Sequence, residues 1–102
     1  MPKVRVAQVS ELPPGTLKTY EVEGEHILLA NVDGRIYAMG AICSHEEWDL
    51  SEGTLEGETV ICAGHGAIWN LKTGRAEFSE PLPPLPTYKV AVENDTIYLV
   101  VE

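Results

Sequence analysis

The segment Ala41–Asn70, AICSHEEWDLSEGTLEGETVICAGHGAIWN, holds both cysteines of the chain and two of its three histidines. Cys43 and His45 stand two positions apart, sixteen residues follow, and Cys62 and His65 stand three positions apart. Thiolate and imidazole are ligands that soft and borderline transition metals take from proteins. The segment therefore predicts a metal centre on which these four side chains converge.

Each cysteine–histidine pair can face a single centre. Residues two apart in an extended loop point the same way, and a tight turn brings residues three apart together. Gly64 and Gly66 flank His65 and give its turn backbone freedom. Such loops also aim backbone N–H groups inward, where they hydrogen-bond sulfur and stabilise negative charge.

Three interpretations of the four residues compete. Structural zinc sites usually place two cysteines together and two histidines together, whereas the order here is Cys-His-Cys-His. A chance arrangement of buried residues would have to use every cysteine of the chain at complementary spacing. An iron–sulfur cluster in which two histidines replace two cysteines on one iron fits the order directly.

The motif pair Cys43-x-His45 and Cys62-x-x-His65 resembles that of the Rieske 2Fe–2S proteins. The stretch HEEWDLSEG, residues 45–53, is similar to the first loop of the ferredoxin components of bacterial aromatic-ring dioxygenases, in which Trp-x-Leu-Ser-Glu-Gly follows the first histidine. Lys72-Thr73-Gly74, the proline-rich loop Pro81–Pro86 and Tyr88-x-Val90 are similar as well. The resemblance covers nearly the whole chain and is strongest from Met39 to Gly74.

This resemblance implies a cofactor, its ligands and a function. Cys43 and Cys62 would bind the inner iron of one 2Fe–2S cluster, and His45 and His65 would bind the outer iron through Nδ1. The loop Pro81–Pro86 would cover the cluster. The protein would be a monomeric one-electron carrier, not itself an enzyme, that links a flavin reductase to a terminal oxygenase of aromatic compounds.

Two other functions stay open. One is a Rieske subunit of a different redox enzyme, such as the small subunit of a nitrite reductase. The other is a two-Cys, two-His structural zinc module that binds proteins. The sequence shows no nucleophile–base pair and no phosphate-binding loop. Outside the two motif pairs His26 is the one remaining histidine, which cannot by itself bind a second metal, so the sequence predicts no catalytic site. A lone His26 within a strand is expected to be a surface or structural residue.

Two departures from the respiratory Rieske proteins predict a low reduction potential. Those proteins carry an additional disulfide, and they place Ser and Tyr hydroxyls two and four residues after the second histidine. Here those positions are Ala67 and Trp69, and both cysteines are already assigned as ligands. Fewer hydrogen bonds to sulfur favour the oxidised cluster, so we expect a potential near roughly −150 mV rather than +300 mV.

The rest of the chain predicts an all-β fold, an antiparallel β sandwich or small barrel without a helix of ten residues. Asp33-Gly34 is the strongest hairpin signal, and His26–Val32 is a nearly continuous apolar run typical of a buried strand. We expect one Rieske-like domain, a base of residues 1–40 and 86–102 with a cluster-binding subdomain of about 41–85 inserted. The expected strands are 4–9, 19–22, 26–32, 35–39, 59–62, 67–71, 88–92 and 96–101.

The amino-acid composition limits the classes of partner that the protein is expected to bind. The 102 residues suffice for one domain, and seven basic against sixteen acidic residues give a formal charge of −9. Nucleic acid and anionic membranes are therefore excluded as expected partners, and basic protein surfaces are favoured. No apolar run approaches the roughly 20 residues of a membrane helix, and the first residues lack the apolar stretch of a signal peptide, so we expect a cytoplasmic protein.

The acidic residues Glu46, Glu47 and Asp49 follow the first histidine closely. They are interpreted either as a solvated rim or as a docking site for basic residues. Trp48 in the same loop either packs in the core or contacts a partner.

Overall fold

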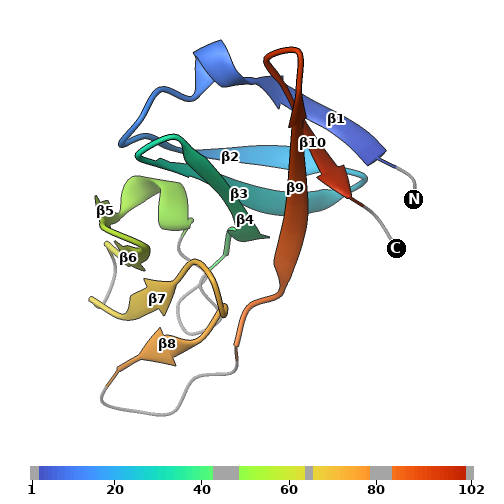
Figure 1. Cartoon of the computed structure of the whole chain (residues 1–102). Helices are drawn as coiled ribbons and strands as arrows, with labels where there is room; N and C mark the ends of the chain where they lie inside the picture. Colours follow the sequence, from blue (N-terminus) through green and yellow to red (C-terminus); the bar gives the residue numbers. More distant parts are fainter. Residues whose placement is uncertain (1–2, 43–48, 64–65, 79–83, 101–102) are drawn as a thin grey trace.

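Ten strands form two antiparallel sheets in the part of the chain that the computed structural model describes, residues 3–42, 49–63, 66–78 and 84–100 (Figure 1). The larger sheet has the order β1-β10-β9-β4-β3-β2 and the smaller one the order β5-β6-β7-β8. The strands of the larger sheet are β1 (Lys3–Gln8), β2 (Leu17–Val22), β3 (Glu25–Val32), β4 (Arg35–Gly40), β9 (Thr87–Glu93) and β10 (Thr96–Val100). Those of the smaller sheet are β5 (Thr54–Glu56), β6 (Thr59–Ile61), β7 (Ile68–Asn70) and β8 (Ala76–Glu77).

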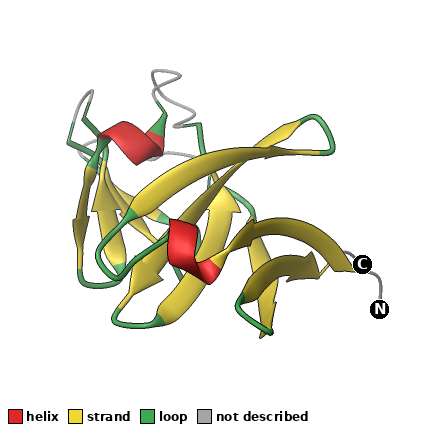
Figure 2. Ribbon diagram, turned by 90° about the horizontal axis from the view of Figure 1, so that it is seen from above, coloured by secondary structure: helices red, strands yellow, loops and turns green. Residues whose placement is uncertain are grey.

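The larger sheet curls into a nearly closed barrel, and Figure 2 shows this curvature from above. Two short 3-10 helices, η1 (Val9–Glu11) and η2 (Leu50–Glu52), are the only helical turns among the described residues. None of these elements is a helix long and apolar enough to span a membrane. The predicted all-β fold is confirmed.

Two-residue turns connect the hairpins of the larger sheet. Asp33 and Gly34 join β3 to β4 with φ values of 51° and 94°, and Asn94 and Asp95 join β9 to β10 with φ values of 50° and 63°. Positive φ at both central residues produces the twist that adjacent antiparallel strands require. The hairpin predicted at Asp33-Gly34 is therefore confirmed, and the expected strands 88–92 and 96–101 pair with each other in a second hairpin.

Strand β3 is buried on both of its faces, which explains its continuous apolar sequence. Ile27 and Leu29 pack inside the barrel, together with residues of β1 and β10. Leu28 and Ala30 point the other way and pack against the smaller sheet. Burying one such side chain contributes about 1.5–3 kcal/mol, so this strand holds the two sheets together.

Sequence patterns missed two strands and shifted several strand ends by one or two residues. Thr54–Glu56 and Ala76–Glu77 are absent from the expected strands, but they form β5 and β8. Each offers at most one apolar side chain, so their strand conformation comes from pairing with β6 and β7. The first strand ends at Gln8, because Val9 begins η1.

Candidate metal centre

The first ligand segment is closed by a single bridge. Ile42 and Asp49 form an isolated antiparallel pair, and the backbone N–H of Leu50 donates to the carbonyl of Ala41 over 2.7 Å. Ala41 in turn donates its backbone N–H to His26 of β3 over 3.1 Å. The structure thus fixes both ends of a loop whose residues 43–48, including the predicted ligands Cys43 and His45, lie outside the described residues.

The second ligand segment extends the β6–β7 hairpin. The N–H of Cys62 donates to the carbonyl of Ala67 over 2.8 Å, and the N–H of Gly66 donates to the carbonyl of Cys62 over 3.0 Å. Gly66 has a φ of 76°, a conformation that glycine adopts without strain. Cys62 is 2% exposed. The predicted ligand His65 lies outside the described residues.

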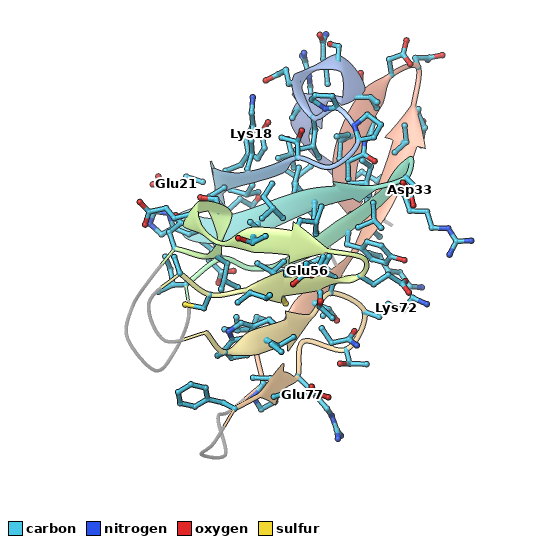
Figure 3. The ribbon with its side chains drawn as sticks, turned by 90° about the vertical axis from the view of Figure 1, so that its left-hand side faces the viewer. Lys18, Glu21, Asp33, Glu56, Lys72 and Glu77 are labelled. Atoms are coloured by element: carbon cyan, nitrogen blue, oxygen red, sulfur yellow. The ribbon has the colours of Figure 1, made fainter. Side chains whose placement is uncertain are left out.

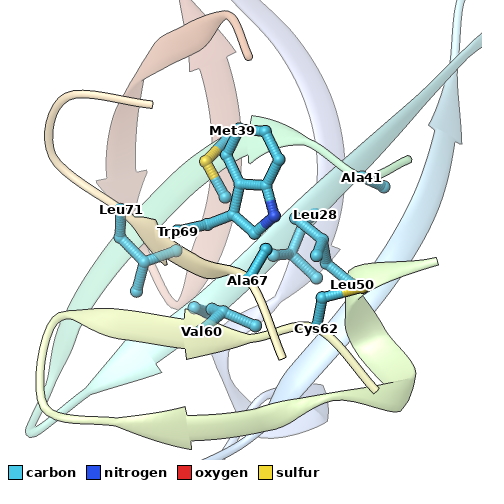
Figure 4. Packing of buried hydrophobic residues seen from close by; sticks show 10 residues of the cluster. Leu28, Met39, Ala41, Leu50, Val60, Cys62, Ala67, Trp69 and Leu71 are labelled. Carbon is cyan, nitrogen blue, oxygen red and sulfur yellow. The ribbon is translucent and has the colours of Figure 1, made fainter. Parts of the chain in front are cut away.

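The ends of the two loops meet in one buried cluster. Ala41 and Leu50 from the first segment lie in one buried cluster with Cys62 and Ala67 from the second and with the indole of Trp69 (Figure 4). The structure therefore places one of the four predicted ligands and brings the ends of both ligand loops together. Convergence of the other three ligands stays a prediction.

The chemistry of this cluster suits an iron–sulfur group. Cys62 contributes a buried sulfur next to apolar side chains, and the buried Trp69 Nε1 has no hydrogen-bond partner among the described residues. Soft thiolate ligands in a dry environment with N–H donors nearby are the surroundings that such clusters take in proteins. The residues present thus fit a 2Fe–2S cluster, which when bound accepts and returns one electron.

Asp49 anchors the first loop to the larger sheet. Its Oδ1 accepts hydrogen bonds from the Thr19 hydroxyl of β2 over 2.5 Å, from the Ser51 N–H over 2.9 Å and from the Ser51 hydroxyl over 2.8 Å. Burial alone would raise the pKa of Asp49, but the hydrogen bonds from Thr19 and Ser51 outweigh it and hold that pKa below its ordinary value. Asp49 is thus a structural acceptor and the N-cap of η2, which corrects its interpretation as rim or docking charge.

Replacing either partner of this anchor is expected to loosen the loop. Asp49→Asn and Thr19→Val are each expected to lower the free energy of unfolding by about 1–3 kcal/mol, the cost of disrupting a hydrogen bond to a charged group. The double variant is expected to lose less than the sum of the two, because both remove the same contact. Urea denaturation of the four proteins measures this coupling, and strict additivity would contradict it.

The same anchor has a defined pH dependence. A carboxyl whose pKa is lowered on folding stabilises the protein above its ordinary pKa, and this stabilisation is lost as the pH falls through the lowered value. The stability difference between the wild-type protein and Asp49→Asn is therefore expected to be complete at pH 7 and to shrink below about pH 4. An unchanged difference at low pH would show that the carboxylate charge plays no part.

The chain returns to the larger sheet beside the two loops. Leu85 donates its N–H to the carbonyl of Gly74 over 2.8 Å, and Gly40 donates its N–H to Pro86 over 2.9 Å. The segment 79–83, which includes part of the proline-rich loop predicted to cover the cluster, lies outside the described residues. His26 is exposed on β3, as expected for a surface residue.

Two contributions to the site escaped sequence reasoning. The role of Asp49 as an N-cap could have been found from the pattern Asp-Leu-Ser-Glu, in which an N-cap acceptor precedes a short turn. The sequence marks Trp69 only as a position without a hydroxyl. Its buried N–H depends on packing between β7 and the loop ends, and no sequence signal reports such packing.

Comparisons with known proteins agree on one family. The model of the Rieske 2Fe-2S domain matches residues 2–89. The ferredoxin component of biphenyl 2,3-dioxygenase from Rhodococcus jostii (strain RHA1) is 35% identical over 102 residues, which cover 100% of this chain and 95% of that protein.

Solved structures give the same result. The ferredoxin of carbazole 1,9a-dioxygenase from Nocardioides aromaticivorans IC177 superimposes with a TM-score of 0.90 at 26% identity and covers 100% of both chains. A chain in a complex of reduced oxygenase and oxidized ferredoxin in carbazole 1,9a-dioxygenase matches with a TM-score of 0.85 at 31% identity, covering 95% of this chain and 91% of that one.

Proposed function

This chain belongs to the family of Rieske 2Fe-2S domains, and from that premise we propose that it is a ferredoxin that takes one electron from a flavin reductase and passes it to a terminal aromatic-ring oxygenase. The observation that carries this proposal is the match, over the whole of this chain, to the ferredoxin component of an aromatic-ring dioxygenase. The protein is then a carrier and not the catalyst of the oxygenation.

The proposed ligands are Cys43 and Cys62 on the inner iron, and His45 and His65 on the outer iron through Nδ1. The buried position of Cys62 supports an inner role for the sulfur ligands. Ala63 and Gly66, on either side of the turn that carries His65, are exposed. This exposure supports electron exchange through an imidazole edge at the protein surface.

The chain's own residues keep the inner side of the centre dry. Ala41, Leu50, Ala67 and Trp69 are each 1% exposed or less and pack with Cys62. We assign residues 1–40 and 86–102 to a base and residues 41–85 to a cluster-binding subdomain. The pairing of β5 to β8 in a sheet of their own supports this division.

The partner surfaces are proposed to be basic. The formal charge is −9, and exposed acidic residues are distributed over both sheets, such as Glu21, Asp33, Glu56 and Glu77 in Figure 3. Attraction between an acidic and a basic protein surface speeds their association, and salt screens this attraction. A relative from a carbazole dioxygenase forms a complex with its oxygenase, which supports the same kind of partner here. We further propose that the protein is a monomer of the cytoplasm, where its two cysteines stay reduced.

The alternatives differ in what they predict. A structural zinc module is set aside, because the chain belongs to the family of Rieske 2Fe-2S domains. A subunit of a nitrite reductase remains the competing function. The two candidates differ in which oxidised partner accepts the electron.

Electron transfer to purified acceptors tests the proposed function. The reduced protein, mixed with the oxidised oxygenase component of a biphenyl dioxygenase or with a nitrite reductase, is followed by the return of the oxidised cluster spectrum in a stopped-flow instrument. We expect rapid, salt-sensitive reoxidation by the oxygenase and a midpoint potential towards roughly −150 mV. Faster reoxidation by the nitrite reductase, or a midpoint well above zero, would contradict the proposal.

A further inference from the structure

Trp69 on β7 presents a buried polar group that the described structure leaves unused. The residue is 0% exposed, and its Nε1 has no hydrogen-bond partner among the described residues. A buried N–H without an acceptor costs free energy, and native proteins seldom leave one unsatisfied. The position of Trp69 therefore calls for an acceptor.

The neighbours of Trp69 are the ends of the two ligand loops. Ala41, Leu50, Cys62 and Ala67 share its buried cluster. Figure 4 shows the indole nitrogen on the edge of the ring turned towards Leu28 and Ala41, whereas Met39 lies along the opposite edge. The N–H thus belongs to the side of the ring from which the first ligand loop departs.

Main-chain acceptors beside the indole are already engaged. The carbonyl of Ala41 accepts from Leu50, that of Cys62 accepts from Gly66, and that of Ala67 accepts from Cys62. The side chains in this cluster are hydrocarbon or sulfur. The structure gives the indole N–H no acceptor among these groups, and the sulfur of an iron–sulfur centre is an acceptor that the bound centre itself would bring.

We propose that the indole N–H of Trp69 donates a hydrogen bond to a sulfide of the bound 2Fe–2S centre, because the structure shows no hydrogen bond from this N–H to the Cys62 Sγ. This inference rests on the proposed function. One-electron reduction makes the centre more negative, so an N–H aimed at its sulfur stabilises the reduced form more than the oxidised form and raises the potential. Trp69 is then a tuning residue that partly replaces the hydroxyl donors absent at positions 67 and 69.

Removing the donor while keeping an aromatic ring tests this role. Trp69→Phe is expected to retain iron and to shift the oxidised-to-reduced ratio about tenfold towards the oxidised form at a fixed electrode potential. For one electron this is a fall of about 59 mV in the midpoint. A variant that binds its cluster and titrates at the wild-type midpoint would overturn the proposal.

Tyr37→Phe is the matched control. Tyr37 is partly buried against the same cluster, and its hydroxyl donates to Glu58 over 2.7 Å. The control therefore also deletes one hydrogen-bond donor from an aromatic residue of this core. It is expected to keep the wild-type midpoint, whereas an equal fall would show that the shift in Trp69→Phe comes from general loosening.

A second measurement leaves Trp69 intact, in case its replacement prevents folding. The chain has two tryptophans, so Trp48→Phe leaves Trp69 as the only indole for selective 15N labelling. In the reduced protein, electron spin-echo spectroscopy is expected to detect coupling of this 15N to the cluster. A normal cluster signal without the coupling would overturn the hydrogen bond alone, whereas a protein that forms no paramagnetic cluster would overturn the proposed function as well.

Discussion

Cys62→Ser is expected to abolish the cluster. The Cys62 sulfur is buried between the two loop ends, and a serine hydroxyl is a far poorer ligand for iron than a thiolate. We expect the iron content to fall from two atoms per chain to below about a tenth of that. Because a metal centre that binds only the folded state stabilises it, we also expect a lower unfolding temperature. Iron analysis, visible absorption and thermal unfolding measure these effects.

Val60→Thr distinguishes loss of a ligand from loss of stability. Val60 is fully buried in the same core as Cys62, and threonine introduces a hydroxyl there without touching a proposed ligand. An unsatisfied buried hydroxyl costs about 1–3 kcal/mol. The control is expected to be less stable but to keep its iron, and a Cys62→Ser protein that also keeps its cluster would contradict the assignment of Cys62.

Gly74→Ala is expected to destabilise the fold strongly although it lies outside the proposed ligands. Gly74 has a φ of 75°, and a Cβ built on it would lie 2.0 Å from the carbonyl oxygen of Leu85. Alanine would therefore be strained and would also push away the segment hydrogen-bonded to Gly74. Together these effects are expected to cost about 3 kcal/mol or more, a fall of roughly 12–24 °C in Tm.

Substitutions at two further glycines separate the effect of backbone strain from the effect of the Cβ clash. Gly24 has a φ of 84° and open space around it, so Gly24→Ala tests backbone strain alone and is expected to cost about 1–2 kcal/mol. Gly53 has a negative φ of −84°, but its Cβ would lie 2.1 Å from the Ile61 carbonyl oxygen, so Gly53→Ala tests the clash alone. If Gly74→Ala proved no more harmful than Gly24→Ala, the close approach of Leu85 would not matter.

The sequence predicted correctly the hairpin turn and the buried strand, because both depend on residues that are neighbours in the chain. Asp33-Gly34 adopts the positive φ values that its hairpin requires, and the apolar run of β3 reflects burial on both faces. The strands β5 and β8 were missed because hydrogen bonding to neighbouring strands holds them, and their own side chains carry little pattern. A strand that its partners stabilise cannot be recognised from a window of its own residues.

The site divides in the same way. The four proposed ligands could be picked out because their types and spacing are rare together. The contacts that support these ligands could not be predicted. Asp49 accepts a hydrogen bond from Thr19, thirty residues away in the sequence, and Trp69 packs in one cluster with the loop ends only because of the tertiary fold. The proposed ligands can be identified from the spacing of a short motif, whereas the residues that position them and tune the cluster are brought close only by the tertiary structure.

The central claim is that two cysteines and two histidines of this chain hold a one-electron 2Fe–2S cluster. The most direct test is electron paramagnetic resonance of the reduced protein, expressed in medium that contains 15N-labelled histidine. The account predicts a signal of low average g coupled to two histidine nitrogens, unchanged in His26→Asn and lost or reduced to one nitrogen in His45 and His65 variants. A colourless protein with one zinc per chain, or a cluster signal without histidine nitrogens, would contradict it.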